Sequence, residues 1–130
     1  MKTRFVVRGV PVGKPRMTKR DKWKRRPCVL RYRAWADAAR AAAGLIDKAL
    51  LTHPTEVIFT AYMPIAARHR KGMRELMRGT ACTVKPDRDN IDKALCDALF
   101  ANDHFVFAGA QKKLWDDGHG PRVEVEIIAR

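Results

Sequence analysis

The chain has 130 residues, of which 46% are hydrophobic and 32% charged, so it is long enough for one folded domain with a modest core. Lys and Arg number 27 against 14 Asp and Glu, and the net charge of +13 predicts a polyanionic partner, with nucleic acid the first candidate and a membrane surface the second. The sequence has no apolar run of about 18 residues and no apolar signal segment after Met1-Lys2-Thr3-Arg4, which excludes a membrane span and leads us to expect a cytoplasmic protein.

A short strand is predicted over residues 4–10, and it ends at Gly9 and the turn Pro11-Val12-Gly13. A basic loop follows at about residues 14–29, and Trp23 and Tyr32 are interleaved with the positive side chains of residues 14–33. Mixed basic and aromatic residues suit phosphate contacts and base stacking, so we expect a DNA-contacting arm; a solvated charged loop is the alternative. The candidate DNA contacts in this loop are Lys14, Arg16, Lys19, Arg20, Lys24 and Arg25.

Apolar residues at helical spacing predict an amphipathic helix over residues 30–50, and a β-branched and aromatic run predicts a strand over 55–63. Residues 66–80 form a second basic flap, with Arg68, Arg70 and Lys71 as further candidate DNA contacts. Residues 81–84 can pair as a short strand that leads into the next segment. Cys28, Cys82 and Cys96 are odd in number and fit no paired metal spacing, so we interpret them as unpaired thiols that fill space in a reducing compartment.

Residues 85–93, Lys-Pro-Asp-Arg-Asp-Asn-Ile-Asp-Lys, concentrate carboxylates in a basic chain. Two acids at i and i+2 near a helix start can converge on one hard cation, and oxygen ligands favour Mg²⁺ or Mn²⁺. The alternative needs no metal: Asp89 caps a helix that runs to about Phe100, with Asp92 as the second member of a capping box.

The helical wheel of this segment places Ile91 and Leu95 on a core-facing arc, and it places Asp89, Lys93 and Asp97 on the opposite arc. Lys93 then stands one turn above Asp89 and beside Asp97. An ordinary ion pair of Lys93 with one of these acids, worth a few tenths of a kcal/mol, is the alternative to an active-site role.

The last segment has strand signals at residues 105–107 and 111–115, a turn at 117–120, and alternating Val123, Val125 and Ile127. We interpret it as a terminal hairpin. The complete pattern predicts a single α+β domain over residues 1–130, with a small mixed β-sheet and two main helices packed on one face.

The pattern Asp87-x-Asp89-Asn90-x-x-Lys93-x-x-x-Asp97-Ala98-Leu99 resembles the signature helix of the RusA-type Holliday-junction resolvases. The opening, with Gly9-x-Pro11 and Lys14-Pro15-Arg16 before a basic loop, is also similar to phage members. The resemblance implies a homodimeric, Mg²⁺-dependent endonuclease of phage or prophage origin that cuts four-way DNA junctions, with Mn²⁺ as a substitute and no small-molecule cofactor. It further implies that Asp87 and Asp89 bind the metal, that Lys93 is the active-site lysine, and that Asn90 and Asp97 are supporting polar residues.

The sequence departs from the family at one position. The family usually has an acidic pair before a Gln in the segment after the helix, and its second acid completes the metal site, whereas this chain has Ala108-Gly109-Ala110-Gln111. Asp103 lies just beyond the far end of the predicted helix, too far to return to Asp87. We therefore predict weak metal binding and slow or absent cleavage, unless Asp92, Asp116, Asp117 or a partner subunit contributes.

Two function classes follow, a junction-resolving nuclease and a branched-DNA-binding protein whose catalysis is weakened or lost. A generic RNA- or DNA-binding protein is a third interpretation, which explains the charge but not the clustered aspartates.

Overall fold

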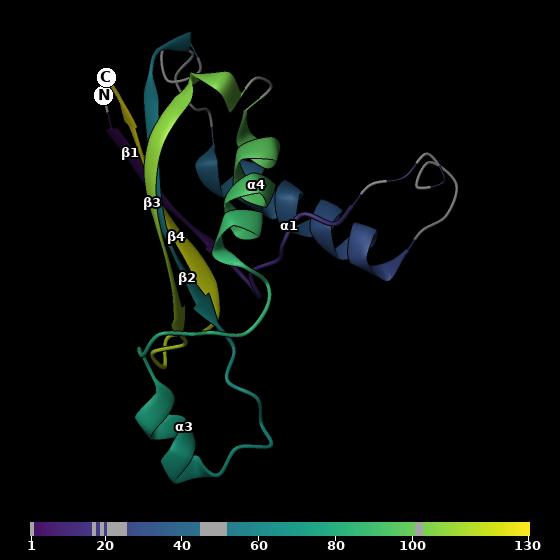
Figure 1. The fold of residues 1–130 in the computed structure, drawn as a ribbon, viewed down its shortest axis with the longest axis vertical. Coiled ribbons are helices and arrows are strands. Elements are labelled where there is room, and N and C mark those ends of the chain that lie inside the picture. Colours follow the sequence, from purple (N-terminus) through teal and green to yellow (C-terminus); the bar gives the residue numbers. More distant parts are fainter. Residues whose placement is uncertain (1, 17, 19, 21–25, 45–51, 101–102) are drawn as a thin grey trace.

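The computed structural model describes residues 2–16, 18, 20, 26–44, 52–100 and 103–130. They form a four-stranded sheet of β1 (Lys2–Arg8), β2 (Thr55–Met63), β3 (Val106–Trp115) and β4 (Arg122–Ala129), in the order β1-β4-β2-β3. β4 is antiparallel to β1 and to β2, whereas β2 and β3 are parallel. The helices α1 (Pro27–Ala43) and α4 (Arg88–Leu99) both cover one face of this sheet (Figure 1). This confirms the predicted α+β class with a mixed sheet.

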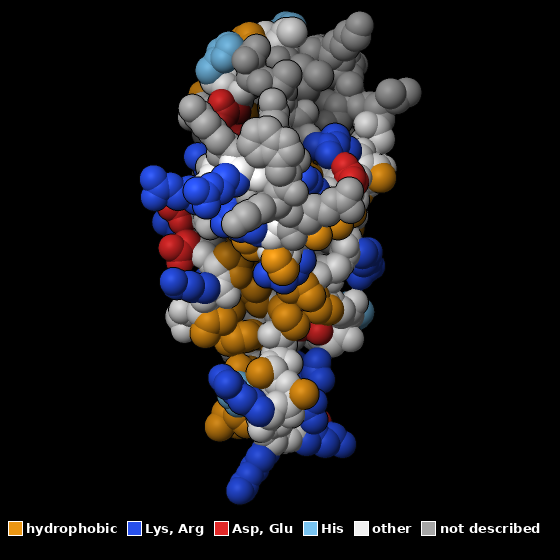
Figure 2. All heavy atoms as spheres, turned by 90° about the vertical axis from the view of Figure 1, so that its right-hand side faces the viewer, with side chains coloured by type: hydrophobic (Ala, Val, Ile, Leu, Met, Phe, Trp, Pro, Cys, Tyr) orange, Lys and Arg blue, Asp and Glu red, His pale blue; other side chains and the backbone are white. Residues whose placement is uncertain are grey.

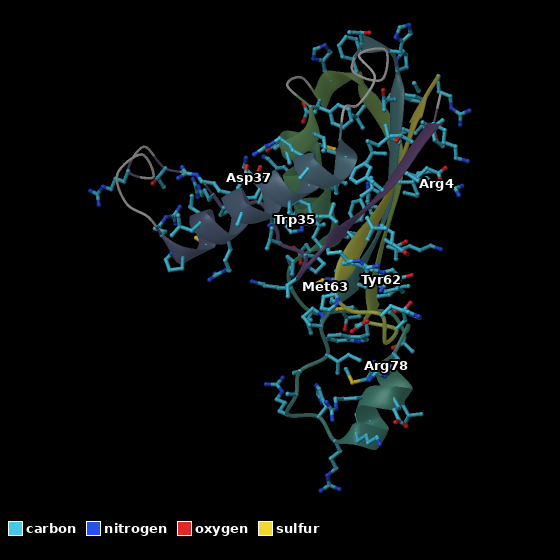
Figure 3. All side chains as sticks on the ribbon, turned by 180° about the vertical axis from the view of Figure 1, so that it is seen from behind. Arg4, Trp35, Asp37, Tyr62, Met63 and Arg78 are labelled. Atoms are coloured by element: carbon cyan, nitrogen blue, oxygen red, sulfur yellow. The ribbon has the colours of Figure 1, made fainter. Side chains whose placement is uncertain are left out.

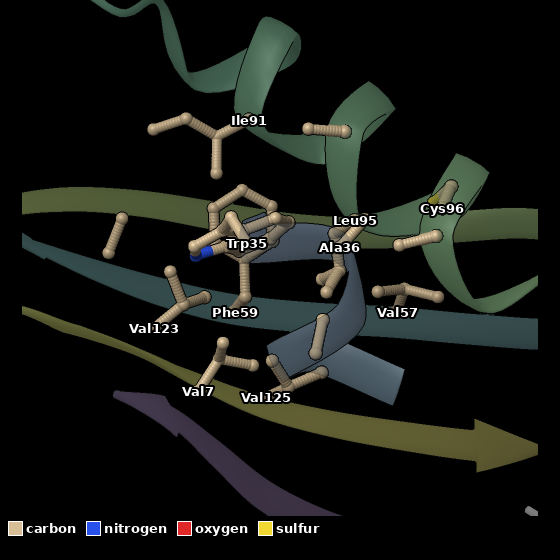
Figure 4. Packing of buried hydrophobic residues seen from close by; sticks show 14 of the residues in the cluster. Val7, Trp35, Ala36, Val57, Phe59, Ile91, Leu95, Cys96, Val123 and Val125 are labelled. Carbon is tan, nitrogen blue, oxygen red and sulfur yellow. The ribbon is translucent and has the colours of Figure 1, made fainter. Parts of the chain in front are cut away.

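The core lies between the two helices and that face (Figure 4). Alternate residues of β2 are buried along its whole length, as expected for a strand with one covered face. Leu95 and Ile91 of α4 are fully buried over Phe59 and Val57 of β2. The buried strand and helix residues labelled in the figure are Val7, Trp35, Ala36, Val57, Phe59, Ile91, Leu95, Cys96, Val123 and Val125.

The predicted terminal hairpin is wrong. The turn after Trp115 does reverse the chain, but β2 lies between β3 and β4 in the sheet. β3 pairs instead with β2, in parallel, because the connection between these two strands crosses over through α4. A turn signal specifies a reversal of the chain but not the neighbour of the strand that follows it.

Several boundaries differ from the predicted ones. α1 begins at Pro27, a residue well suited to a first helical turn, and it ends before Gly44, whose φ is +63°. The continuation predicted to residue 50 falls on residues outside the described part. β1 starts and ends two residues earlier than predicted, and the expected strand at residues 81–84 is reduced to a single bridge between Ala81 and Leu114.

Residues 64–80, which we call the basic arm, project from one end of the sheet and contain α3 (Lys71–Met77) (Figure 1). No residue of α3 is buried. The arm leaves and returns at one place, because Asp116 N donates to Met63 O at 2.8 Å and Gly79 N donates to Trp115 O at 3.0 Å. Among the described residues, no helix is long and apolar enough to span a membrane.

Candidate metal and nucleic-acid site

The acidic stretch lies at the N-terminus of α4. Asp87, not the predicted Asp89, occupies the N-cap position: its backbone is extended, and its carbonyl accepts hydrogen bonds from the N–H groups of Asn90 and Ile91, both at 3.1 Å. Both residues are aspartates, which suit an N-cap equally well, so the sequence pattern could not distinguish the two positions. The Asp87 carboxylate makes no capping hydrogen bond, so the predicted capping box is absent and this carboxylate is not consumed by the helix amides.

Asp87 and Asp89 are both exposed, and they line one surface hollow of about 360 Å³ together with Cys82, Arg88 and Lys113. Within the described part of the chain, neither carboxylate has an ion pair or a side-chain hydrogen bond. The positive end of the helix dipole lies beside them and favours negative charge there. The structure therefore brings the two predicted metal ligands to the same hollow with their oxygens free.

The N-terminal segment packs against this helix start. Lys14 N donates to Asn90 O at 3.2 Å, and a Cβ atom at Gly13 would come within 2.7 Å of Asn90 Nδ2, so a larger residue there would require the Asn90 amide to move. A second hollow of about 470 Å³ runs between residues 11–15 and Asp87, and Arg31 of α1 lines its wall. Asn90 thus has a structural role, since it docks the chain that precedes the first basic loop.

Lys14 and Asp97, two further predicted site residues, pair with each other. Lys14 Nζ lies 3.0 Å from an Asp97 carboxylate oxygen and 3.4 Å from the Tyr32 hydroxyl, and it stands 4.6 Å from the centre of the Tyr32 ring. Partial burial by itself lowers the pKa of Lys14, but the hydrogen bonds to Asp97 and Tyr32 outweigh it and hold the pKa above its usual value. Lys14 therefore ties the N-terminal segment to α4 and α1, and its charge is largely compensated within the protein.

Lys93 is exposed on α4. Among the described residues no ion pair joins it to Asp89 or to Asp97, and the latter is engaged by Lys14 instead. The alternative of an ordinary i, i+4 ion pair is thus not what the structure contains. The ammonium group remains available to a ligand at the same end of the molecule.

Asp92 and Cys96 face the sheet rather than the hollow. Cys96 Sγ donates to Asp92 Oδ1 at 3.7 Å. Burial raises the pKa of Asp92, while hydrogen bonding to Cys96 and Gln111 opposes that rise. Burial and the neighbouring Asp92 together raise the pKa of Cys96 to about 12, so this thiol stays protonated at neutral pH and is a poor nucleophile or metal ligand.

The position that matches the family's missing acid has no room for a side chain. A Cβ atom at Gly109 would lie 2.3 Å from the carbonyl oxygen of Val57 on the neighbouring strand β2. The other suggested substitutes are engaged elsewhere: Asp117 binds the buried Arg122 guanidinium through two hydrogen bonds of 3.0 Å, and Asp116 Oδ1 accepts the N–H groups of Gly118 and Gly120. The guanidinium of Arg122 holds the pKa of Asp117 well below its usual range.

The described residues contain no cluster of three or more His, Cys, Asp or Glu side chains able to hold a metal ion. Two carboxylates nevertheless fit Mg²⁺, which proteins usually bind through one or two carboxylates while water and substrate phosphates complete the shell. The donor set of Asp87 and Asp89 therefore suits a cation that binds together with a phosphate-containing ligand.

The predicted DNA-contacting side chains lie on two segments, the first basic loop and the basic arm. Arg16, Arg20, Arg68, Arg70 and Lys71 are all exposed, whereas Lys19, Lys24 and Arg25 lie outside the described residues. Lys and Arg cover much of the narrow end of the molecule in Figure 2, which is the basic arm, and Figure 3 places Arg78 where the arm returns to the sheet. Exposed hydrophobic residues lie between these charges, with Leu76 of α3 75% exposed.

The sequence did not indicate a role for Lys113 of β3. Its Nζ donates hydrogen bonds to the carbonyl oxygens of Val84 and Pro86, the second at 2.7 Å. The only local signal is the pair Lys112-Lys113 within a strand, since one of two successive strand residues must point toward the covered face.

Comparison with known protein families gives a match over most of the chain. A family model described as Endodeoxyribonuclease RusA matches residues 8–128, which include both strands of the parallel pair, α4 and the hollow. No curated protein matches the chain.

Proposed function

The chain belongs to the RusA endodeoxyribonuclease family, whose members are nucleases that resolve Holliday junctions, and from this premise we propose that it cuts four-way DNA junctions with the help of Mg²⁺. The observation that carries the proposal is the pair Asp87 and Asp89, whose free carboxylates line one hollow at the N-terminus of α4. Mn²⁺ has the same preference for oxygen ligands and is the expected substitute.

In this proposal Asp87 and Asp89 hold the ion. When bound, a divalent metal supplies an activated water and a positive charge beside the scissile phosphate. The exposed ammonium of Lys93 stabilises negative charge on the phosphate or protonates the leaving oxygen. Asn90 and Asp97 act indirectly, by fixing the N-terminal segment beside the site: Asn90 contacts residues 13–14, and Asp97 pairs with Lys14.

The basic residues bind the DNA backbone. Arg68, Arg70 and Lys71 of the basic arm are exposed, and so are Arg16 and Arg20 near the first loop, so their charges can neutralise phosphates. We include Lys19, Lys24 and Arg25 in the same surface on sequence grounds, and Lys14 only as a secondary contact because Asp97 already pairs with it. Resolution of a four-way junction requires two nicks, which a homodimer with one site in each subunit would provide.

Gly109 favours a second candidate function, a branched-DNA-binding protein with weakened or lost catalysis. An acid at position 109 would force β2 and β3 apart, because its Cβ atom would lie 2.3 Å from Val57 O. Both functions predict salt-sensitive binding, so a salt titration does not separate them.

The test is a gel assay in which binding and nicking of a synthetic four-way junction are measured in the same samples, with Mg²⁺, with Mn²⁺ and with neither. We expect paired, metal-dependent nicks. Asp87→Asn should reduce the nicking rate about 100-fold or more, which corresponds to an activation barrier raised by about 2.7 kcal/mol. Junction binding should be retained. Asp37→Asn is the matched control, because Asp37 is an exposed acid on α1 that pairs with Arg40.

Tight junction binding without nicks under either metal would reject the nuclease in favour of the binding protein. Equal affinity for four-way junctions and linear duplex would reject both.

A further inference from the structure

We propose that Lys113 is a positioning residue that holds the segment carrying Asp87 in place beside Asp89. The proposal rests on the function proposed above, since it assigns Lys113 a role in building the same site. Lys113 reaches this segment in two ways: its side chain binds the carbonyl oxygens of Val84 and Pro86, and its main-chain oxygen accepts the N–H of Cys82 at 3.0 Å.

The strand register explains why Lys113 can do this and its neighbour cannot. Lys113 pairs with the buried Ala61 of β2, and the flanking pair Met63↔Trp115 lies on the same covered face of the sheet. Lys112 pairs with Thr60 and points to the opposite face, where it is exposed. A lysine on the covered face would be costly unless its ammonium group found acceptors. The two carbonyl oxygens supply them.

Residues 83–86, between the buried Cys82 and the N-cap residue Asp87, have little other hydrogen-bond support. They contain no helix or strand, and in the described part of the chain the hydrogen bonds that reach them come from Lys113. α4 begins immediately afterwards and is fixed by the core through Ile91. Asp89 lies within the packed helix, whereas Asp87 is its N-cap: its carbonyl oxygen binds the first helical N–H groups, and the loop of residues 83–86 leads into it. Lys113 fixes the loop to the rigid sheet.

The charge of Lys113 matters as well as its hydrogen bonds. It lines the hollow that also contains Asp87, Asp89 and Arg88, so its positive charge shares this hollow with two carboxylates of like charge. The ammonium group reduces the repulsion between these carboxylates in the metal-free protein. Loss of the group should let Asp87 move away from Asp89, which would weaken the cation site without removing any of its ligands.

The test compares Lys113→Met, which keeps the length of the side chain and removes the donors, with Lys113→Arg and with Lys112→Met. Lys112→Met is the matched control, since it removes the same charge from the adjacent position on the other face. The first measurement is hydrogen exchange in the metal-free proteins. We expect faster exchange of the amides of Cys82, Asn90 and Ile91 in Lys113→Met only, because their hydrogen bonds hold the two ends of residues 82–87.

The second measurement is a Mn²⁺ titration of each protein, read by the electron paramagnetic resonance signal of the free ion. Residues that orient metal ligands typically change affinity by about 10- to 100-fold, and we expect a loss of that size for Lys113→Met, none for Lys112→Met and partial retention for Lys113→Arg.

Unchanged exchange of these three amides in Lys113→Met would overturn the inference, and so would a Mn²⁺ affinity equal to that of Lys112→Met. If Lys113→Met proves unfolded by circular dichroism, Lys113→Arg decides: a folded arginine variant in which the three amides are unprotected would reject the role of the positive donor, and protected amides would support it. Failure of the wild-type protein to nick any junction would reject the nuclease and leave the exchange result standing.

Discussion

Gly109 offers the sharpest test of how this structure accommodates its departure from the family. Gly109→Asp restores the acid that the family usually has at this position, and Gly109→Ala adds only the Cβ atom. If the missing acid were a simple loss, Gly109→Asp should tighten metal binding at little cost. The structure predicts the opposite, because the Cβ atom itself has no room.

The magnitude follows from the contact with Val57. A Cβ atom at position 109 would lie 2.3 Å from Val57 O, so the two strands must separate by at least 0.7 Å to reach a tolerable 3.0 Å. Val57 belongs to β2, which pairs with β3 on one side and β4 on the other, so its carbonyl cannot move alone. Overpacking of this kind costs about 1–3 kcal/mol. Replacing glycine also lowers the conformational entropy of the unfolded chain, which stabilises the folded protein by about 0.4–1 kcal/mol.

We therefore expect Gly109→Ala to lower the free energy of unfolding by about 1–2 kcal/mol, or the melting temperature by roughly 3–10 °C for a domain of this size. Gly109→Asp should be at least as unstable and should bind Mn²⁺ no more tightly than the wild type. Gly72→Ala is the control, since a Cβ atom at this helical position meets nothing within 4 Å and should not lower the melting temperature. Thermal unfolding by circular dichroism and a Mn²⁺ titration measure both effects. A Gly109→Asp protein of wild-type stability with tighter Mn²⁺ binding would refute the reasoning.

Three further predictions concern the core, a buried acid and the arm. Leu95→Ala should lower the free energy of unfolding in urea by about 2–5 kcal/mol, because Leu95 is fully buried on the inner side of α4. A loss below about 1 kcal/mol would contradict its place in the core. Burial raises the pKa of Asp92, so the contribution of this carboxyl to stability should fall as pH rises above its ordinary pKa of about 3.8, and Asp92→Asn should become more stable relative to the wild type over that rise in urea unfolding; a constant difference would argue against a raised pKa. Replacement of Arg70 and Lys71 by Gln should lower the salt slope of junction binding by about 0.9 for each phosphate that is no longer neutralised, and an unchanged slope would exclude the arm from the DNA surface.

The sequence predicted those elements whose signals are local. The strand at Thr55–Met63 was predicted at its observed bounds, because its β-branched and aromatic residues and the preceding Pro54 both mark it. The partner of β3 was not predicted correctly, since the parallel pairing with β2 depends on the crossover through α4 and not on residues of β3 itself.

The site shows the same division. Asp87 and Asp89 are recognisable from their spacing, and the structure brings them to one hollow. Lys113 and Gly109 are far along the chain from the acids, and each matters because of backbone carbonyls on another segment. No periodicity within β3 could reveal such an interaction, because it exists only once the strands are in register.

The closed base of the basic arm has an evolutionary consequence. Met63 and Gly79 are both held by backbone hydrogen bonds at the end of β3, so the intervening positions 64–78 can be shortened, lengthened or replaced while the two anchor points stay 2.8 Å and 3.0 Å from their partners. The reach of the basic arm is then adjustable separately from the two carboxylates that we propose hold the metal ion. Exchange of this segment between relatives would provide a modular route to new junction preferences on an unchanged scaffold.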